Sequence, residues 1–188
     1  MIKFTKMHGT GNDYVIINTL KEKFKNISNT ATKMCNRNFG IGADGLLLIE
    51  NSDNADFAMK MINPDGTEAE MCGNGIRCFS KYLYDHKLTS KKTITIDTLA
   101  GIKTLDLNIK NNKVDTIIVD MGEPILQRDR IPMLGEPGMV IDELLHLDDG
   151  ANFKITAVSM GNPHAVIFVE DIDNFPIEKY GPIIENHD

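Results

Sequence analysis

One segment of this 188-residue sequence concentrates residue types that can move a proton. It runs Asn63-Pro-Asp-Gly-Thr-Glu-Ala-Glu-Met-Cys-Gly-Asn-Gly-Ile-Arg-Cys78, and Cys72 stands just before a predicted helix. Backbone N–H groups at a helix start attract anions and stabilise a thiolate, which acts as a base or nucleophile. The N–H groups of Gly73 and Asn74 can also hold a substrate carboxylate. A buried structural cysteine beside a glycine loop would have the same sequence, and the residues alone leave both interpretations open.

The other two cysteines are predicted to be structural. Cys78 follows Cys72 at a spacing of about 240° around and about 9 Å along an ideal helix, so the two thiols cannot lie on opposite faces of one substrate carbon. The spacing also fits no common pair of zinc ligands. Cys35 falls on the apolar stripe of another predicted helix. We therefore expect both Cys35 and Cys78 in the core.

Three asparagines at predicted turns, Asn12, Asn63 and Asn162, are candidate binding residues. Asparagine commonly forms turns by hydrogen bonding its own backbone, and the alternative is a set of neutral amides that bind a zwitterion. His164 follows the Asn162-Pro163 turn, where a histidine is either structural or exposed and catalytic. No histidines are paired with metal-ligand spacing, so no metal site is predicted.

Two helices are predicted near these residues. The first covers Ser28–Asn38, with Ser28 or Asn29 as its N-cap. The second covers Asn74–Asp85, and its small and apolar residues lie on several sides, so we expect it to be well buried. The positions that recur at helical spacing are Ala31, Met34 and Cys35 in the first helix, and Ile76, Phe79, Ser80 and Leu83 in the second.

Short strands are predicted for most of the remaining sequence. Several alternate with period two, so that one face carries Phe57, Met59 and Met61, and another Leu105, Leu107 and Ile109. The strand candidates are Ile2–Met7, Tyr14–Asn18, Leu46–Glu50, Asp56–Asn63, Thr93–Thr98, Ile102–Ile109, Val114–Met121, Lys154–Met160 and His164–Glu170. Gly40-Ile-Gly-Ala-Asp-Gly45 has the letters of a dinucleotide-binding turn. Because a helix precedes it and a strand follows, we interpret it as a helix-to-strand turn.

The pattern changes near residue 119, which divides the chain into two predicted domains, 1–118 and 119–188. In the second domain, Gln127–Gly150 is rich in Pro, Gly and charge and is predicted to be a loop with a short helix at Asp142–His146. Gly11–Ile17 and Gly161–Ile167 both place a Gly-Asn turn before an apolar strand. This similarity is consistent with two related halves.

Composition and charge exclude several classes of protein. The chain carries 20 Lys+Arg and 27 Asp+Glu, a net charge of −7, so it lacks the cation excess of a general nucleic-acid or anionic-membrane binder. Its apolar runs are too short to span a bilayer, and its N-terminus has no apolar signal core. Three cysteines do not form a disulfide framework, so we expect a cytoplasmic protein.

Together these segments resemble the diaminopimelate epimerase family, the cofactor-independent amino-acid epimerases of lysine and cell-wall precursor synthesis. The Asn63–Arg77 stretch is similar to the family's signature around its first catalytic cysteine. Four further motifs match in the family's order, and the resemblance runs from Met1 to the last residues. The four further motifs are Lys6-Met-His-Gly-Thr-Gly-Asn-Asp-Tyr-Val15, Gly40-Ile-Gly-Ala-Asp-Gly45, Met121-Gly-Glu-Pro124 and Ser159-Met-Gly-Asn-Pro-His164.

The resemblance implies an α/β (α+β) fold of two pseudo-twofold-related halves, each with strands around a central helix, and an amino-acid substrate between them. It implies interconversion of LL- and meso-diaminopimelate without a cofactor, with Cys72 as one of two catalytic cysteines and His164 near the catalytic centre. Family members often form homodimers. The substrate contacts that the resemblance implies are Asn12, Asn63, Gly73, Asn74 and Asn162.

The sequence departs from the family in two places. Position 45 is a substrate-contacting glutamine in many members, whereas here it is Gly45, as in other members, so no side-chain contact is available. The family also continues past Gly181–Glu185 with another asparagine, a Glu-Arg pair and a second cysteine in a Cys-Gly-Thr-Gly loop. We therefore expect an incomplete second half and a chain that lacks normal activity alone. Two alternatives stay open, a racemase of another amino acid on this fold and an inactive remnant that acts only in binding.

Overall fold

The chain divides into two compact units, Met1–Met121 and Gly122–Asp188, which we call unit 1 and unit 2. The computed structural model describes residues 2–20 and 25–187, so the outer ends of the predicted domains, Met1 and Asp188, lie outside the described residues. Each unit has its own hydrophobic core and is described by itself.

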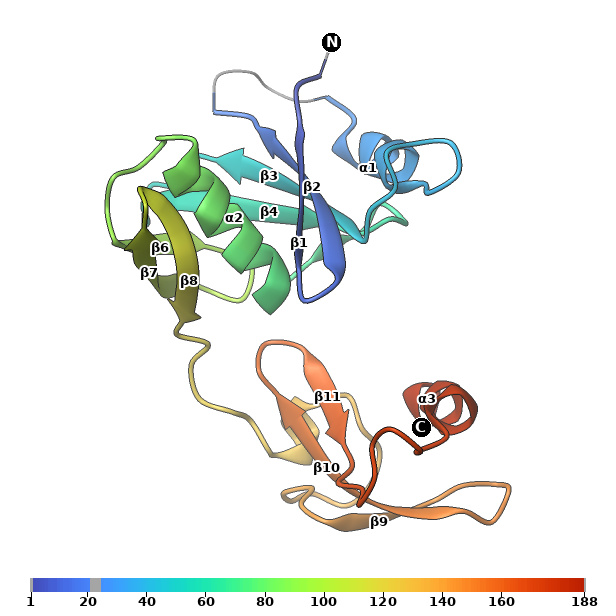
Figure 1. Ribbon diagram of the computed structural model, residues 1–188. Helices are drawn as coiled ribbons and strands as arrows, with labels where there is room; N and C mark the ends of the chain where they lie inside the picture. The colour runs from blue at the N-terminus through green and yellow to red at the C-terminus, as the bar shows by residue number, and fades with distance from the viewer. Residues whose placement is uncertain (1, 21–24, 188) are drawn as a thin grey trace. The chain divides into compact units, whose positions relative to one another are not determined.

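In the described part of unit 1, eight strands form one mixed sheet in the order β1-β2-β3-β4-β6-β7-β8, with β5 paired to β4 (Figure 1). The pairs β2–β3 and β4–β6 are parallel, and the other neighbours are antiparallel. The strands are β1 Thr5–Gly9, β2 Asn12–Asn18, β3 Gly45–Glu50, β4 Phe57–Ile62, β5 Glu68–Ala69, β6 Thr93–Asp97, β7 Lys103–Lys110 and β8 Lys113–Val119.

The sheet of unit 1 curls around one helix, α2, which covers Gly73–Asp85. This helix contacts β1 and β8 at opposite ends of the sheet, as well as β2, β3, β4 and β7 between them (Figure 1). Its apolar residues Ile76, Phe79 and Leu83 are buried against the strands. The predicted buried helix is therefore confirmed, and so is the arrangement of strands around a central helix in this unit.

Alternation along β2 divides its side chains between two cores. Tyr14 and Ile16 join the core around α2, whereas Val15 and Ile17 join a second core on the other face of the sheet. That second core is covered by α1, Ile27–Cys35. The strands beside α2 follow the same rule, and the predicted inward faces of β4 and β7 are confirmed: Phe57, Met59, Met61, Leu105, Leu107 and Ile109.

The predicted N-cap of α1 is wrong. The helix is capped by Asn26, whose left-handed backbone (φ 54°, ψ 51°) turns the chain into the first helical residue, and its side chain makes no capping hydrogen bond. Ser28 and Asn29 therefore lie inside the first turn. The helix also ends earlier than Asn38, because the Asn36 side chain accepts hydrogen bonds from the backbone N–H groups of Asn38 and Phe39.

Unit 2 contains a three-stranded antiparallel sheet, β11-β10-β9, and one α-helix in its described part. The helix packs its Tyr180 and Ile184 against a core that includes Leu145, Ile155 and Ala157. The Phe153 ring meets the Tyr180 ring edge to face, with centroids 4.9 Å apart. The elements are η1 Arg128–Arg130, β9 Glu143–His146, β10 Asn152–Ser159, β11 Pro163–Val166 and α3 Ile177–Glu185.

The predicted helix at Asp142–His146 is wrong, because these residues form β9 instead. Asp142 itself has a left-handed backbone (φ 52°), and the residues that follow it are extended and pair with β10. Leu145 pairs with Phe153 of β10 and points into the core, whereas Glu143 and His146 are exposed. Burial along this segment therefore follows the two-residue period of a strand and not the period of a helix.

Both Gly-Asn motifs lie at the tips of antiparallel hairpins. Gly11 (φ 91°) joins β1 to β2, and Gly161 (φ 103°) joins β10 to β11. Positive φ at these positions favours glycine. A relation between the two units by duplication stays a prediction.

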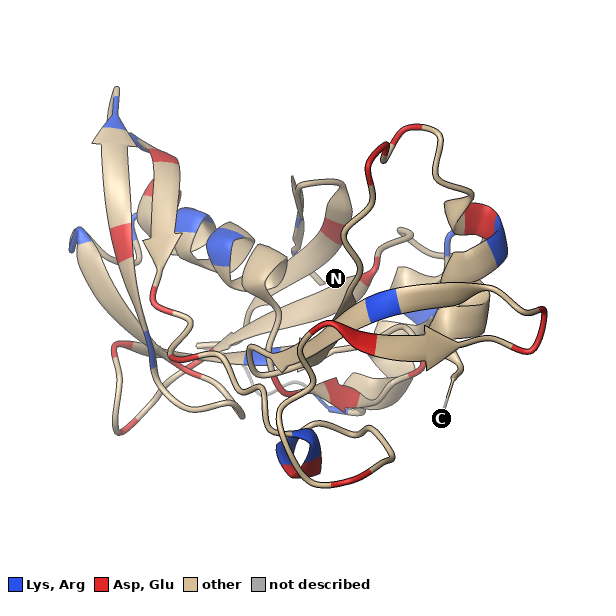
Figure 2. Cartoon of the chain, turned by 90° about the horizontal axis from the view of Figure 1, so that it is seen from below, with Lys and Arg blue, Asp and Glu red and all other residues tan. Residues whose placement is uncertain are grey.

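Charges of both signs are interspersed along the described residues of both units, as Figure 2 shows with Lys and Arg in blue and Asp and Glu in red. Within the same residues, no helix has the length and apolar content needed to cross a membrane.

Candidate active site

The site in unit 1 is built around the first residues of α2. Cys72 is the N-cap, with an extended backbone (φ −145°, ψ 111°), and its Sγ accepts a hydrogen bond from the Gly75 N–H at 3.3 Å. Helix geometry leaves the N–H groups of Gly73 and Asn74 without intrahelical acceptors. The thiol is half-buried, so the helix start presents a sulfur and two backbone donors side by side.

Glycine at position 75 lets the sulfur lie close to the helix. A Cβ built on Gly75 would lie 3.4 Å from Cys72 Sγ and 3.5 Å from Leu47 Cδ2 of β3. Gly73 is less enclosed, since the nearest atom to a Cβ there would be the Arg77 Nη1 at 3.9 Å. The two glycines therefore differ in what a side chain would meet.

A tyrosine from β2 also reaches the sulfur. The Tyr14 hydroxyl oxygen lies 2.9 Å from Cys72 Sγ, and the Tyr14 side chain is otherwise buried in the core around α2. Burial, and secondarily the contact with Cys72, raises the pKa of Tyr14 far above its usual range. Sequence reasoning missed this residue, although the alternation of β2 places Tyr14 on the same face as Ile16.

Two of the predicted binding asparagines meet beside Cys72. The Asn74 Nδ2 donates to Asn12 Oδ1 at 2.6 Å, and the Thr10 hydroxyl donates to Asn74 Oδ1 at 2.8 Å. Arg77 also donates to Asn74 Oδ1. Asn12 Nδ2 in turn donates to Asp44 Oδ2 at 3.2 Å. Each amide group keeps a second N–H for a ligand, since a primary amide has two donors.

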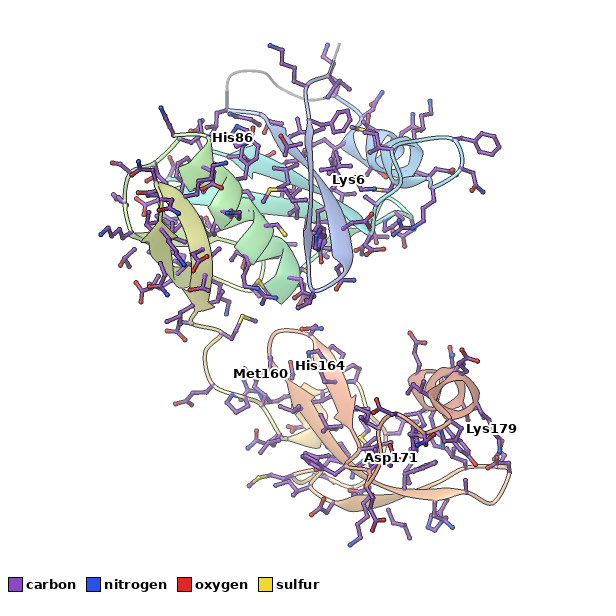
Figure 3. All side chains as sticks on the ribbon, viewed as in Figure 1. Lys6, His86, Met160, His164, Asp171 and Lys179 are labelled. Atoms are coloured by element: carbon purple, nitrogen blue, oxygen red, sulfur yellow. The ribbon has the colours of Figure 1, made fainter. Side chains whose placement is uncertain are left out.

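A charged cluster behind Asn12 fixes its strand to the loop that precedes β3. Asp13 pairs with Arg37 at 2.8 Å and with Lys6 of β1 at 2.9 Å, and Arg37 also pairs with Asp44 at 2.6 Å (Lys6 is labelled in Figure 3). The Arg37 guanidinium, helped by Lys6 and opposed by partial burial, holds the pKa of the Asp13 carboxyl well below its usual range. The partners come from distant segments, so no local sequence pattern indicates this cluster.

Asn63 lies in a separate turn, as its default interpretation predicts. Its Nδ2 donates to Thr67 Oγ1 at 3.1 Å, and its backbone N–H donates to the Thr67 carbonyl at 2.8 Å. The turn is closed by the Gly66 N–H, which donates to the Asn63 carbonyl. Among the described residues, these hydrogen bonds do not connect Asn63 to Cys72.

The other two predicted site residues belong to unit 2. Asn162 and His164 lie in the β10–β11 hairpin, and both are exposed (His164 is labelled in Figure 3). The structure therefore brings together Cys72, Gly73, Asn74 and Asn12, all in unit 1. The role of Asn162 and His164 beside Cys72 stays a prediction.

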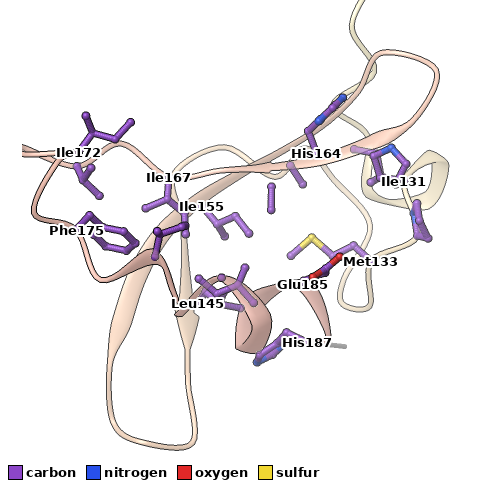
Figure 4. A pocket seen from close by; sticks show the side chains of 18 residues that line it. Ile131, Met133, Leu145, Ile155, His164, Ile167, Ile172, Phe175, Glu185 and His187 are labelled. Carbon is purple, nitrogen blue, oxygen red and sulfur yellow. The ribbon is translucent and has the colours of Figure 1, made fainter. Parts of the chain in front are cut away.

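A pocket of about 680 Å³ also lies in unit 2, and His164 is on its rim (Figure 4). Most of its lining is apolar, for example Ile131, Leu145, Ile155 and Ile167. An amino-acid zwitterion needs polar partners for its charges, so this lining does not suit one.

The remaining cysteines are core residues, as predicted. Cys78 is 4% exposed in the core around α2, and Cys35 is 3% exposed beneath α1. Burial raises the pKa of both thiols. All three cysteines are free, and Cys72 is the half-exposed one.

Comparison with known proteins gives one family. The family model described as Diaminopimelate epimerase matches residues 4–127. A protein of Methanococcus maripaludis named Diaminopimelate epimerase is 54% identical over 187 residues, which are 100% of this chain and 67% of that protein. One of the same name from Acetivibrio thermocellus is 51% identical over 186 residues, or 99% of this chain and 66% of that protein. The chain thus spans about two thirds of the length of these relatives.

Solved structures show a similar fold at low sequence identity. A hydroxyproline epimerase from Agrobacterium vitis has a TM-score of 0.65 at 11% identity, covering 88% of this chain and 51% of its own. A probable proline racemase from Agrobacterium radiobacter also has a TM-score of 0.65, at 13% identity, covering 89% of this chain and 52% of its own. Both similarities concern the fold alone.

Proposed function

The chain belongs to the diaminopimelate epimerase family, and from this premise we propose that Cys72 is one of the two proton-transfer groups for the interconversion of LL- and meso-diaminopimelate. The observation that carries the proposal is the position of Cys72 Sγ at the N-cap of α2, beside available N–H groups. Such a position suits a thiolate base and a bound carboxylate together.

The proposed chemistry begins with the Cα–H bond of the substrate. The Cys72 thiolate takes the proton, and the electron pair of the broken bond is delocalised onto the neighbouring carboxylate. The N–H groups of Gly73 and Asn74 stabilise the charge that develops there. A proton returned to the opposite face of Cα inverts the centre. When the reaction runs in the other direction, the Cys72 thiol supplies that proton.

The opposite face needs a second acid. Cys35 and Cys78 are both buried, so neither can reach a substrate held at Cys72. We therefore expect the 188-residue chain to lack normal epimerase turnover by itself. In this proposal Asn12 and Asn74 bind the polar groups of the substrate through their second amide hydrogens. Binding by Asn63 and Asn162, and a catalytic role for His164, rest on the family resemblance.

The test uses a hybrid protein, in which this chain is followed by the segment of the Methanococcus maripaludis relative beyond its match. With LL-diaminopimelate in D₂O, NMR follows both deuterium uptake at Cα and the LL-to-meso ratio. We expect exchange with inversion in the hybrid, loss of both in its Cys72→Ala variant, and no inversion by the chain alone. Inversion that survives Cys72→Ala would contradict the proposal. Inversion of other amino acids but not diaminopimelate would favour a racemase of different specificity.

We also propose a cytoplasmic location and a homodimer. The location is supported by the three free thiols, which a reducing compartment maintains. The homodimer rests on the family resemblance. Light scattering of the hybrid protein tests it directly, and a monomeric mass across the micromolar range would contradict it.

A further inference from the structure

The sulfur of Cys72 is held from two directions. The Gly75 N–H approaches it from within α2 at 3.3 Å, and the Tyr14 hydroxyl approaches it from β2 at 2.9 Å. Tyr14 and Cys72 are 58 residues apart in the sequence, so the contact joins the strand and the helix start. A hydroxyl whose ring is otherwise in the core is thus aimed at the one half-exposed thiol.

We propose that Tyr14 is a positioning residue for Cys72, whose hydroxyl donates a hydrogen bond to the thiolate and fixes the direction of its sulfur. The proposal deepens the function proposed above and rests on it. It adds to that function a side chain that acts on the reaction through the Cys72 sulfur.

The surroundings of Tyr14 keep the hydroxyl in place. The side chain is 2% exposed, and β2 is hydrogen-bonded on both sides, with Tyr14 opposite Met7 of β1 and Gly45 of β3. A Cβ on Gly45 would lie 3.6 Å from the ring and 3.2 Å from Met61, so glycine there leaves the ring its space. Close packing on the ring restricts the hydroxyl to the neighbourhood of the sulfur.

Hydrogen bonding favours the charged form of the sulfur. Either atom of the Tyr14–Cys72 pair can donate when the thiol is protonated, but a thiolate only accepts. Two donors, Tyr14 and Gly75, then converge on one anion, and bonds to a charged acceptor are the stronger ones. Because its pKa is raised, Tyr14 keeps its proton and stays a donor.

Other ionisable groups also act on this pair. Cys78 lies behind it on α2, and Asp44 in the loop before β3 contributes a negative charge. Arg77 on α2 contributes a positive charge that acts on Cys78. None of these is changed by removal of the Tyr14 hydroxyl, so a Tyr14→Phe variant isolates the hydrogen bond.

The first experiment measures alkylation of Cys72 by iodoacetamide in the 188-residue chain, from pH 6 to pH 11, with peptide mapping to separate the three cysteines. In Tyr14→Phe we expect the Cys72 rate at pH 7 to fall about tenfold, as loss of one hydrogen bond to a charged group implies. The difference should vanish at the alkaline end, where the thiolate forms without help. Tyr82→Phe removes another half-buried hydroxyl of unit 1 and should leave the rate within about twofold of wild type.

Collapse of the structure would give a different pattern, because it exposes Cys35 and Cys78 and raises the alkylation of these two thiols. A second measurement on the unaltered chain therefore accompanies the variant. With tyrosine labelled at Cζ by ¹³C, the Tyr14 resonance is assigned by elimination with Phe variants of Tyr82, Tyr84 and Tyr180. It should shift with pH in step with the Cys72 alkylation rate, and shift again when Cys72 is alkylated.

The outcomes separate the two proposals. A wild-type Cys72 that reacts no faster at pH 7 than an unstructured cysteine overturns the thiolate proposal and the role of Tyr14 together. A fast wild-type Cys72 with the same rate profile in Tyr14→Phe overturns the role of Tyr14 alone. A Tyr14 resonance that does not shift when Cys72 is alkylated also overturns the role of Tyr14 alone.

Discussion

Asn12 and Asn74, 62 residues apart in the sequence, are joined by a 2.6 Å hydrogen bond between their side-chain amides. The bond connects the first residue of β2 with the first turn of α2. It also fixes which way each amide faces, because Thr10 donates to the Asn74 oxygen and Asp44 accepts from the Asn12 nitrogen. The second N–H group of the Asn12 amide and that of the Asn74 amide are therefore held beside the start of α2.

We expect Asn74→Ala to lower kcat/KM of the hybrid protein by about tenfold or more, because it removes one substrate donor and releases the Asn12 amide. The effect should be mainly on KM, with kcat less affected. The matched control is Asn108→Ala, which removes a hydrogen bond to Thr116 between β7 and β8 and leaves the Asn12–Asn74 hydrogen bond in place. Equal losses in the two variants would show that the effect on Asn74 is structural.

The pH dependence of stability should include a contribution from Asp13. Its folded-state pKa is lowered, chiefly by Arg37, so the unfolded chain binds the proton more readily. The stabilisation is then fully present above the unfolded pKa of about 3.9 and is lost as pH falls through the folded pKa. Urea unfolding of wild type and Asp13→Asn should show a constant gap between about pH 5 and 8, and a smaller gap below about pH 4.

The control for this pH dependence is Asp53→Asn, a change at an exposed aspartate before β4. Its unfolding free energy should follow that of wild type at every pH. If the gap between wild type and Asp13→Asn kept its size at pH 3, the ion pair with Arg37 would not be its cause.

Gly75→Ala and Gly73→Ala should have different effects on Cys72. At position 75 the new methyl group meets the sulfur and Leu47, so we expect the alkylation rate of Cys72 to change several-fold. At position 73 its nearest neighbour is the Arg77 Nη1 at 3.9 Å, an ordinary contact distance, and the rate should stay near wild type. Helix propensity favours alanine over glycine at both positions by up to about 1 kcal/mol. Urea unfolding measures the stability of each variant, so a changed Cys72 rate in a variant of unchanged stability indicates a local effect of the methyl group.

The native chain should have one fast thiol and two slow ones. Cys72 is half-buried, whereas Cys35 and Cys78 are inside the two cores of unit 1, where burial raises their pKa. Reaction with a disulfide reagent at pH 7.5 should therefore show one rapid phase, followed by two thiols that react only as the chain unfolds. Cys72→Ala should remove the rapid phase, and Cys35→Ala should keep it. A rapid phase of three thiols would contradict the buried positions.

Much of unit 1 followed from the sequence, because its signals are local. The helical period of α2 indicates which side of the helix is buried, and alternation does the same for β2, β4 and β7. Cys78 falls on a buried side of α2, and Cys35 on that of α1. The helix start at Cys72 was equally visible, since glycines mark the first turn. The glycine-rich segment Gly40–Asp44 also proved to connect α1 to β3, and Gly45 is the first residue of that strand.

The missed features depend on contacts between distant residues. Tyr14 reaches Cys72 only because the sheet curls around α2, and Arg37 reaches Asp13 only because the loop before β3 returns to β2. The error at β9 has the same origin, since pairing with β10 overrides the weak local preference of Glu143–His146. The helix α3 was missed because Gly181 and Pro182 inside it are typical of turns.

The curled sheet of unit 1 also has a consequence for the order of folding. Because α2 touches β1 and β8 at opposite ends of the sheet, its buried face is covered only after segments from both ends of the unit have met. Contacts of such long sequence separation form slowly, since the chain loses loop entropy before it gains them. Protection of the buried Cys78 thiol on α2 during refolding therefore reports that the sheet has closed around the helix.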